Sequence, residues 1–333
     1  MKNKKNIAVY LGIIILLLIG CKESPNEPGD NTQLPDSTSQ NFIWERNSSV
    51  GLYNDAWGSS SDNIYFVGHI YPDSHHQYGT NIMHWNGQEY KQLNILEGIL
   101  NGIYGFDKNS IWTVGYYENS ALVMNWNGNE WKSLKLEQYS GLTDIWGSSP
   151  TNIFAVGYNG TILKYNGNQW LKMDSQTDLS LFKIWGTNSN NIYATGYDSR
   201  SGKGVLLHFN GQSWLKIFDN NINDNPPSGM MYAIWGYDST FYLIAGSGRY
   251  TGQMYEWSEI ELPNETTGIN EVKGNNQKDI FMVGYFGLMM HWNGKRWKLF
   301  NNFDSTIDFR NVFPIGDEVF GLGNYIYRGV RIN

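Results

Sequence analysis

A pattern that recurs seven times after residue 41 constrains the fold more than any other feature of the chain. The clearest copy runs from Leu142 to Met173 and reads LTDIWGSSPTNIFAVGYNGTILKYNGNQWLKM. In six copies, eleven residues separate the end of one apolar segment from the glycine that ends the next, and in the seventh copy the step is ten. The pairs are Trp57–Gly68, Tyr104–Gly115, Trp146–Gly157, Trp185–Gly196, Trp235–Gly246, Lys273–Gly284 and Phe313–Gly323. A period of about 38 to 50 residues predicts an array of similar supersecondary units.

Each copy has the pattern of four short β-strands. β-Branched and aromatic residues fill four segments, and Gly, Asn, Asp and Ser separate them. Five copies place Asn-Gly between the third and fourth segments, the pair that best accepts a positive φ at both positions of a two-residue hairpin. These hairpins are Asn86-Gly87, Asn127-Gly128, Asn166-Gly167, Asn210-Gly211 and Asn293-Gly294.

Tandem four-stranded antiparallel units predict an all-β fold, the β-propeller. Seven copies predict seven blades, with six or eight left open because the last copy lacks both the Asn-Gly hairpin and the fourth-segment tryptophan. The segment Phe42–Arg46, before the first copy, has the composition of the missing strand. We therefore expect this N-terminal strand to close the ring within the last blade, which leaves no open sheet edge.

The N-terminus has the features of an export signal. Lysines at the start precede an uncharged apolar run, Ile7 to Ile19, that is too short to span a bilayer comfortably. Leu18-Ile19-Gly20-Cys21 resembles the lipobox of bacterial lipoproteins, and the resemblance implies acylation of Cys21 after cleavage. Cys21 is the only cysteine, so a disulfide is impossible. An ordinary signal peptide with a chance cysteine is the alternative.

Three regions are expected from these patterns. They are a signal peptide at 1–20, a lipidated Cys21 with a flexible tether at 21–40, and the propeller at 41–333. The tether is rich in Ser, Pro, Asn, Asp and Gly, which cannot bury enough apolar surface to fold. The lipobox implies attachment to the cell envelope, and Lys22 favours the outer membrane if enterobacterial sorting rules apply. The sequence leaves open whether the protein is on the periplasmic or the surface face of that membrane.

The charge balance argues against nucleic acid as a partner. Lys2, Lys4 and Lys5 leave with the signal peptide, so the 24 basic residues fall to 21 against 31 acidic ones, a net charge of −10. A chain this acidic, with no basic tract, is poorly suited to a phosphate backbone.

The repeat frame W-G-S-S-x-x-N-I-[YF]-A-V-G…N-G-x-x-W resembles that of uncharacterised bacterial BNR- and YVTN-like propellers. The resemblance implies the architecture and not an activity, because one fold supports many functions. The sialidase Asp-box, Ser-x-Asp-x-Gly-x-x-Trp, is absent, and Asn-Gly takes its place. Glycosidase activity is therefore not carried over from the resemblance.

Tryptophans and histidines also follow the repeat. We interpret all fourteen tryptophans as packing residues at repeat positions, with Trp257 assigned to a third strand. His84, His208 and His291 share one position in different blades and so cannot converge on a metal, while His75-His76 with Asp73 lies in an insertion. No nucleophile elbow or phosphate loop occurs. We predict no catalytic residue, metal or cofactor, with carboxylates paired across blades left open.

Length variation predicts a binding face. It is confined to second-to-third and fourth-to-first connections, which lie on one face of a propeller, and exposed variable loops often bind ligands. The longer connections are His69–Asn81, Tyr116–Ala121, Tyr197–Val205, Ser247–Gln253 and Asp219–Met230.

Two sets of residues are candidates for ligand contact on that face. Polar residues stand two positions before the end of the first strand, and we expect them at the channel mouth. They are Asp55, Asp144, Lys183, Glu271 and Asn311, with Gly102 and Ala233 in the other copies. An aromatic rim is expected from Tyr116, Tyr158, Tyr197 and Tyr285. Alternatively, the polar set satisfies buried backbone groups and the tyrosines pack on neighbouring blades.

The sequence thus predicts a membrane-anchored, monomeric, non-enzymatic binding module that presents one propeller face to a protein or glycan partner. One alternative is a carbohydrate-active enzyme, a glycoside hydrolase or lyase with carboxylates at the channel mouth. Another is a scaffold in envelope protein assembly.

Overall fold

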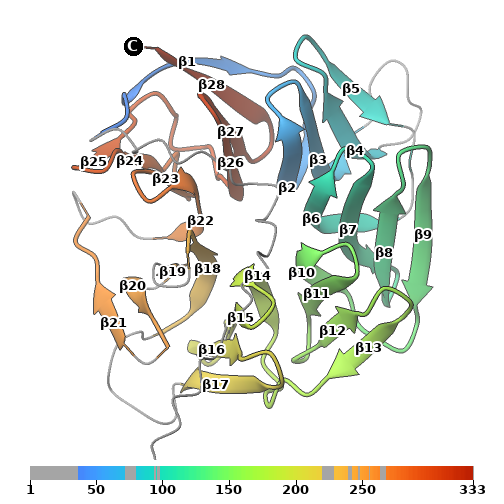
Figure 1. The fold of residues 1–333 in the computed structure, drawn as a ribbon. Coiled ribbons are helices and arrows are strands. Elements are labelled where there is room, and N and C mark those ends of the chain that lie inside the picture. Colours follow the sequence, from blue (N-terminus) through green and yellow to red (C-terminus); the bar gives the residue numbers. More distant parts are fainter. Residues whose placement is uncertain are drawn as a thin grey trace, which may run out of the picture.

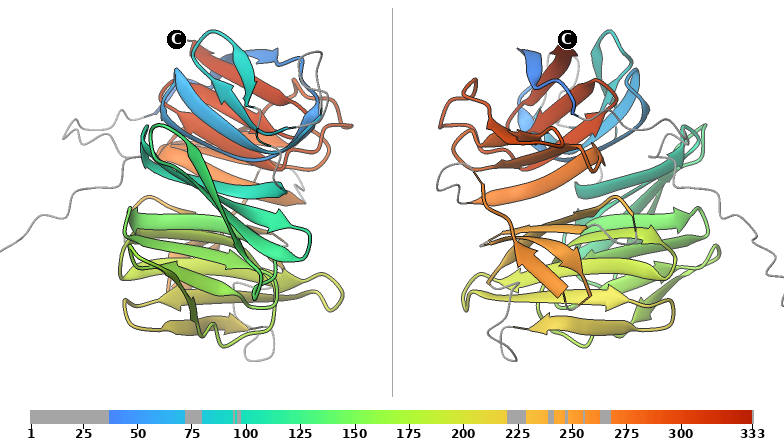
Figure 2. Two further views of the ribbon diagram at one scale, coloured as in Figure 1. Left: turned by 90° about the vertical axis from the view of Figure 1, so that its right-hand side faces the viewer. Right: turned by 60° about the vertical axis from the view of Figure 1, so that its left-hand side comes forward.

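A computed structural model describes residues 37–71, 80–93, 95, 98–219, 229–238, 242–246, 248–254, 256–262 and 268–332. Within these ranges the chain forms 28 β-strands in seven four-stranded antiparallel sheets. Figure 1 shows the sheets as blades around a common centre, and Figure 2 shows the ring from the side with the connections on its two faces. The protein is a seven-bladed β-propeller, as the repeat predicts.

Six blades are built from strands consecutive in the sequence, from the innermost to the outermost (Figure 1). Three of them contain β2 (Gly51–Ser60), β3 (Asn63–Ile70), β4 (Thr80–Trp85) and β5 (Tyr90–Leu93); β6 (Ile99–Asp107), β7 (Ser110–Tyr117), β8 (Ser120–Trp126) and β9 (Trp131–Leu136); and β10 (Leu142–Ser149), β11 (Asn152–Gly157), β12 (Ile162–Tyr165) and β13 (Trp170–Met173). The next three contain β14 (Leu181–Asn188), β15 (Asn191–Asp198), β16 (Lys203–Phe209) and β17 (Trp214–Asp219); β18 (Met231–Gly236), β19 (Tyr242–Gly246), β20 (Arg249–Gln253) and β21 (Glu256–Glu259); and β22 (Ile269–Asn276), β23 (Asp279–Gly284), β24 (Met289–Trp292) and β25 (Trp297–Leu299).

The seventh blade joins the two ends of the described chain. From the innermost strand outward it contains β26 (Asn311–Ile315), β27 (Glu318–Leu322) and β28 (Ile326–Ile332), and its outermost strand is β1 (Asn41–Arg46). β1 pairs antiparallel with β28, and a Cβ on Gly329 would lie only 2.7 Å from the Trp44 ring. The predicted closure by the N-terminal strand is confirmed, with the strand beginning one residue earlier, at Asn41.

The first-strand tryptophans pack one blade against the next. A Cβ on Gly105 would lie 2.7 Å from the Trp57 ring, and one on Gly186 would lie 2.9 Å from Trp146. Trp57 and Trp146 are almost wholly buried in the resulting core. The predicted packing role is therefore found at these positions. A small residue on one inner strand accepts a large aromatic from its neighbour, which fixes the spacing of the blades.

One assignment from the repeat is wrong. Trp257 lies in the fourth strand of its blade, β21, opposite Gly252 of β20, and not in the third. This copy has no Asn-Gly pair, and its hairpin instead contains Met254 with a positive φ of 50°. Without the usual turn marker, the sequence did not show on which side of the hairpin the tryptophan falls.

A β-bulge near the start of the inner strand recurs in six blades. The residue left unpaired is Asn54, Asn101, Thr143, Phe182, Tyr232 or Asn270. In four blades this side chain donates a hydrogen bond to a backbone carbonyl of the next blade, in its inner strand or just before it, with distances of 2.7 to 2.9 Å. Bulges re-aim side chains, and here they link the blades around the ring. In the other two blades the unpaired residue is the aromatic Phe182 or Tyr232.

The predicted signal peptide, Cys21 and residues up to 36 lie outside the described residues, as do Asp73, His75 and His76. The ranges given above include no helix long and apolar enough to cross a membrane.

Candidate functional site

A cavity of about 760 Å³ occupies one end of the central channel. It is lined by the last residues of the inner strands, among them Gly58, Gly186 and Asn276, and by 37–39 ahead of β1. Its volume falls in the range of about 300 to 1,000 Å³ that is typical of ligand sites. The inner strands end here in their short, nearly constant turns. This cavity therefore lies at the opposite end of the channel from the connections that vary in length.

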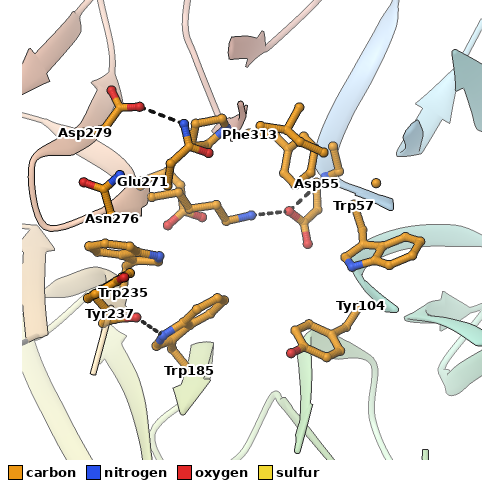
Figure 3. A pocket seen from close by; sticks show the side chains of 18 of the residues that line it. Asp55, Trp57, Tyr104, Trp185, Trp235, Tyr237, Glu271, Asn276, Asp279 and Phe313 are labelled. Atoms are coloured by element: carbon orange, nitrogen blue, oxygen red, sulfur yellow. Dashed lines mark hydrogen bonds and ion pairs between the residues drawn. The ribbon is translucent and has the colours of Figure 1, made fainter. Parts of the chain in front are cut away.

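Aromatic side chains form the walls of this cavity. Five stand at one repeat position near the end of the inner strand, and Tyr237 lies two residues after one of them; the five are Trp57, Tyr104, Trp185, Trp235 and Phe313. Figure 3 shows Trp57 and Tyr104 on one side of the open centre and Trp185 and Trp235 on the other. Trp57, Trp185 and Trp235 thus contact a neighbouring blade and also line the cavity, whereas Trp146 packs between blades without lining it. The interpretation of them as packing residues alone was incomplete.

Lys273 breaks the aromatic pattern. It stands at the repeat position that the other six blades fill with Trp57, Tyr104, Trp146, Trp185, Trp235 and Phe313. Its Nζ lies 2.7 Å from Oδ1 of Asp55, and both residues line the cavity. The departure was visible in the sequence alignment of the repeats, and it would have marked Lys273 as a site residue.

The polar set predicted from the repeat converges on the floor of the cavity. Asp55, Asp144, Lys183 and Glu271 all line it, and Asp55 and Glu271 project between the aromatic walls (Figure 3). Lys183 forms an ion pair with Glu271. Asn311 is fully buried and is not a lining residue. Its Nδ2 donates to Asp55 Oδ1 at 2.9 Å and Glu271 Oε2 at 3.1 Å, which joins the two ion pairs into one network.

The floor carboxylates also hold neighbouring blades together. Asp55 Oδ2 accepts a hydrogen bond from the backbone N–H of Ile103 at 3.0 Å, and Asp144 Oδ2 accepts one from Ile184 at 2.9 Å. Both donors belong to the inner strand of the next blade. The structure therefore contains the contacts of the predicted alternative, in which these residues satisfy buried backbone groups. Contact with a ligand remains a prediction.

The floor lies deeper than a channel mouth on the variable-loop face. Asp55, Asp144, Lys183 and Glu271 each follow the bulge residue of their strand, which already occupies the layer nearest that face. Asp55, Asp144 and Glu271 are 3%, 8% and 1% exposed. Gly102 makes room for this layer, since a Cβ there would lie 2.9 Å from the Asp144 Cα.

Burial and charge shift the pKa values of the floor residues in specific directions. Burial raises the pKa of Asp144 to about 7, against the opposing effect of Lys183. Burial alone would lower the pKa of Lys183, but the carboxylates of Glu271, Asp144 and Asp55 together raise it above its ordinary value. Lys183 is thus held as a cation, whereas Asp144 titrates near neutrality.

The predicted tyrosine rim lies at the other end of the channel. Tyr158 follows β11, and its N–H bonds to Gly141 just before β10 begins. Tyr197 stacks on Phe182 with ring centroids 4.3 Å apart and meets Tyr232 edge-on at 4.6 Å. We call this group, Tyr116, Tyr158, Phe182, Tyr197, Tyr232 and Tyr285, the aromatic end. None of its members is among the described residues that line the cavity.

The members of the aromatic end lie close enough to influence one another's ionisation. Burial first, and then the neighbouring hydroxyls of Tyr232, Tyr285 and Tyr158, raise the pKa of Tyr197 to about 12. Tyr158 and Tyr285 are nevertheless 37% and 44% exposed. The tyrosines therefore converge as the sequence predicts, together with the bulge residues Phe182 and Tyr232, which the repeat did not single out.

The repeated histidines each bond within their own blade. His84 and His208 pair with Asn63 and Asn191 at 2.8 Å, and His291 pairs with Asp279 at 2.6 Å. Each partner is the first residue of the second strand, so the contact is part of the repeat. In the portion of the chain that is described, no three metal-binding side chains come together.

No protein-family model matches the chain, and no curated protein matches it. Solved structures do resemble it. A structure of YCF48 bound to D1 peptide superposes with a TM-score of 0.67 at 14% identity, over 90% of this chain and 100% of that one. YCF48 from Cyanidioschyzon merolae gives 0.62 at 14% identity, over 86% and 98%. The WD40 propeller domain of Doa1 gives 0.60 at 10% identity, over 88% and 98%. At such low identity these likenesses establish the propeller fold.

Proposed function

We propose that this protein is a non-enzymatic interaction module that receives a segment of a protein partner in the cavity. The observation that carries the proposal is the joining, in one cavity of about 760 Å³, of aromatic walls and a charged floor. Apolar walls with a few placed polar groups are the usual composition of a recognition site. In support, YCF48, a protein of the same fold, has been solved with a bound peptide.

Two of the three floor carboxylates are arranged for binding. Asp55 is held by Lys273 and by the N–H of Ile103, and Glu271 is held by Lys183 and Asn311. Such contacts fix the positions of Asp55 and Glu271, which supports recognition by these two side chains. Asp144, whose pKa burial raises to about 7, is the floor residue suited to proton transfer, and it carries the alternative of a glycoside hydrolase or lyase.

Selection of peptides from a random display library, followed by calorimetry on the purified protein, tests the proposal. Trp185 is a half-buried part of the wall, so Trp185→Leu should weaken a selected peptide on the order of tenfold. Leu171→Ala, on the exposed surface of the outer strand β13, is the matched control and should leave affinity unchanged.

Two results would contradict the proposal. The first is peptide binding that is indifferent to Trp185→Leu and to the other wall residues. The second is saturable binding of an oligosaccharide with no peptide selected, which would transfer the site to a glycan partner. Turnover of that oligosaccharide would promote the enzyme alternative.

We also propose that Cys21 is acylated and attaches the module to the cell envelope, at the outer membrane. The lipobox resemblance and the absence of any other cysteine support this. The described chain enters the propeller at the cavity end, where Thr38 donates to the carbonyls of Asn293 and Lys278. Mass spectrometry of the N-terminal peptide and membrane fractionation provide the test. Cys21→Ala should abolish both the lipid mass and sedimentation with the membrane, and unchanged sedimentation would exclude the anchor.

A further inference from the structure

The charged side chains that line the cavity are unequal in number. Five are acidic, namely Asp55, Asp144, Glu271, Asp279 and Asp317. Three are basic, namely Lys183, Lys273 and Arg331. The lining therefore carries an excess of negative charge when all are ionised. The whole chain has the same sign, with a formal net charge of −7.

Each of the three cations is already held by a carboxylate. Lys183 pairs with Glu271, Lys273 with Asp55 at 2.7 Å, and Arg331 with both oxygens of Asp279 at 2.7 Å. These pairs neutralise one another. An anionic ligand at Lys183 or Lys273, whose side chains are 17% and 19% exposed, would have to share the ammonium with a buried carboxylate of its own sign.

Asp144 is the floor carboxylate that these pairs leave over. It forms no ion pair with any residue that the structure describes, although it is only 8% exposed. Its oxygens accept the N–H groups of Ile145 and Ile184, both at 2.9 Å. A carboxylate offers about four acceptor sites, so acceptor capacity remains for a ligand. Burial raises its pKa to about 7 against the opposing effects of Lys183, the Ile184 N–H and Lys273, while Asp55 raises it further, and a ligand cation beside it would favour the ionised form.

The walls have the same preference as the floor. The faces of Trp and Tyr rings are electron-rich and attract a cation within about 6 Å. Of the rings around the centre of the cavity (Figure 3), Trp185 and Tyr237 are half-buried, whereas Trp57, Tyr104 and Trp235 are only 2%, 4% and 3% exposed. Trp185 and Tyr237 are therefore the rings that a cation in the cavity can reach. Lysine and arginine side chains also carry an aliphatic stem that packs on apolar surface while the charged group reaches a polar partner. An aromatic wall above an acidic floor accommodates both parts.

We infer that the cavity recognises a lysine or arginine side chain of the partner segment, with its cationic group directed to Asp144 and its stem against the aromatic walls. This inference rests on the proposed function, because it names the residue of a bound segment that enters the cavity.

Calorimetry with a matched peptide series tests the inference. The probes are the pentapeptides acetyl-Gly-Ser-X-Ser-Gly-amide, where X is lysine, arginine, norleucine or glutamate, and each is titrated into the purified protein at low salt. The lysine and arginine peptides should bind on the order of tenfold more tightly than the norleucine peptide. The glutamate peptide should bind most weakly. Norleucine has the lysine stem without the charge, so it isolates the cation.

Two variants should move this preference in opposite directions. Asp144→Asn should remove most of the lysine advantage and leave norleucine affinity within about twofold. Because Asp144 also accepts a hydrogen bond from the Ile184 N–H, the thermal unfolding of Asp144→Asn is measured alongside its affinities. Lys273→Met removes a floor cation and should increase the lysine advantage. In the wild-type protein at pH 7, titration in two buffers of different ionisation enthalpy should show proton release when the lysine peptide binds.

The failures of the inference and of the proposed function are distinct. Equal affinity for the lysine and norleucine peptides, or a lysine advantage that survives in a folded Asp144→Asn, overturns the inference and leaves a peptide site of other chemistry. If none of the four peptides binds at millimolar concentration, the inference is overturned, and the proposed function is decided separately by the library selection described above.

Discussion

The two ends of the propeller channel differ: one holds the cavity, and the other has the connections that vary in length. At the cavity end the turns between strands are short and nearly constant, and the channel widens into a cavity with a buried charged floor. At the aromatic end the connections vary in length, and half-exposed rings such as those of Phe182 and Tyr197 pack on one another. Loop variation therefore marks where insertions are tolerated, while the cavity is formed by the ends of the inner strands.

The difference extends to what stabilises each end. The cavity end depends on buried charges that bridge blades, such as Lys183 with Glu271. The aromatic end depends on ring contacts that remain partly in water. Losing one partner of a buried ion pair leaves an uncompensated charge, whereas losing one of two stacked rings leaves a solvated surface. Equal substitutions at the two ends should thus have unequal effects.

Removal of the Glu271 carboxylate should have the largest effect. Glu271→Ala leaves Lys183 buried without its partner, and we expect a loss of about 3 to 5 kcal/mol in the free energy of unfolding. Urea denaturation provides the measurement. Adding Lys183→Met should recover most of the loss, because it removes the stranded charge. Asp317→Ala, a carboxylate at the mouth whose side chain is 83% exposed, is the control and should stay within about 0.5 kcal/mol. Similar losses for Glu271→Ala and Asp317→Ala would contradict the contrast between floor and mouth.

Asp144 should contribute to the pH dependence of the free energy of unfolding. An unfolded aspartate has a pKa of 3.8, whereas burial raises the pKa of Asp144 to about 7 in the fold. Between these values the folded state binds more protons, so this residue makes the free energy of unfolding fall as pH rises. The slope should reach at most about 1.4 kcal/mol per pH unit and should level off above pH 7.

Urea denaturation of the wild type and of Asp144→Asn, from pH 4 to 8, isolates this contribution. The stability of the variant relative to the wild type should increase between pH 4 and 7. Asp279, whose pKa is lowered chiefly by His291 and Arg331 against the effect of burial, contributes equally to both proteins and cancels. Parallel pH profiles for the two proteins would exclude an elevated pKa at Asp144.

Close packing at the floor should give the next largest effect. In Gly102→Ala the new Cβ would lie 2.9 Å from the Asp144 Cα and 3.0 Å from its Oδ1. We expect a loss of about 1 to 3 kcal/mol, which is typical of an overpacked core, measured by urea denaturation. The same repeat position accepts Ala233 in another blade, so the position itself tolerates a Cβ. A neutral Gly102→Ala would show that Asp144 moves freely and does not form a fixed floor.

The repeat spacing was enough to predict the blades, the Asn-Gly hairpins and closure by β1, because these depend on local turn chemistry and strand composition. It also grouped Asp55, Asp144, Lys183 and Glu271 correctly, since one repeat position falls at one depth of the channel. It could not show that a bulge occupies the layer above them, because a bulge depends on pairing between strands. The end of the channel that holds the cavity was therefore unpredictable, as was the network through Asn311.

The smallest change in stability is expected at Phe182. It tests whether the aromatic end needs this ring in order to fold. Phe182 stands where Asn54, Asn101 and Asn270 donate to a carbonyl of the next blade. Phe182→Ala should lose about 0.5 to 1.5 kcal/mol with the Tyr197 stack. Phe182→Asn loses the same stack but can form the hydrogen bond of the other blades, which contributes a similar amount. We therefore expect Phe182→Asn to lie within about 0.5 kcal/mol of the wild type in urea denaturation. If it is instead less stable than Phe182→Ala, the new amide does not reach the carbonyl of the next blade and remains without a hydrogen-bond partner. If Phe182→Asn is as stable as the wild type, folding does not require an aromatic residue at this position. The ring at the aromatic end then serves contacts made at the surface.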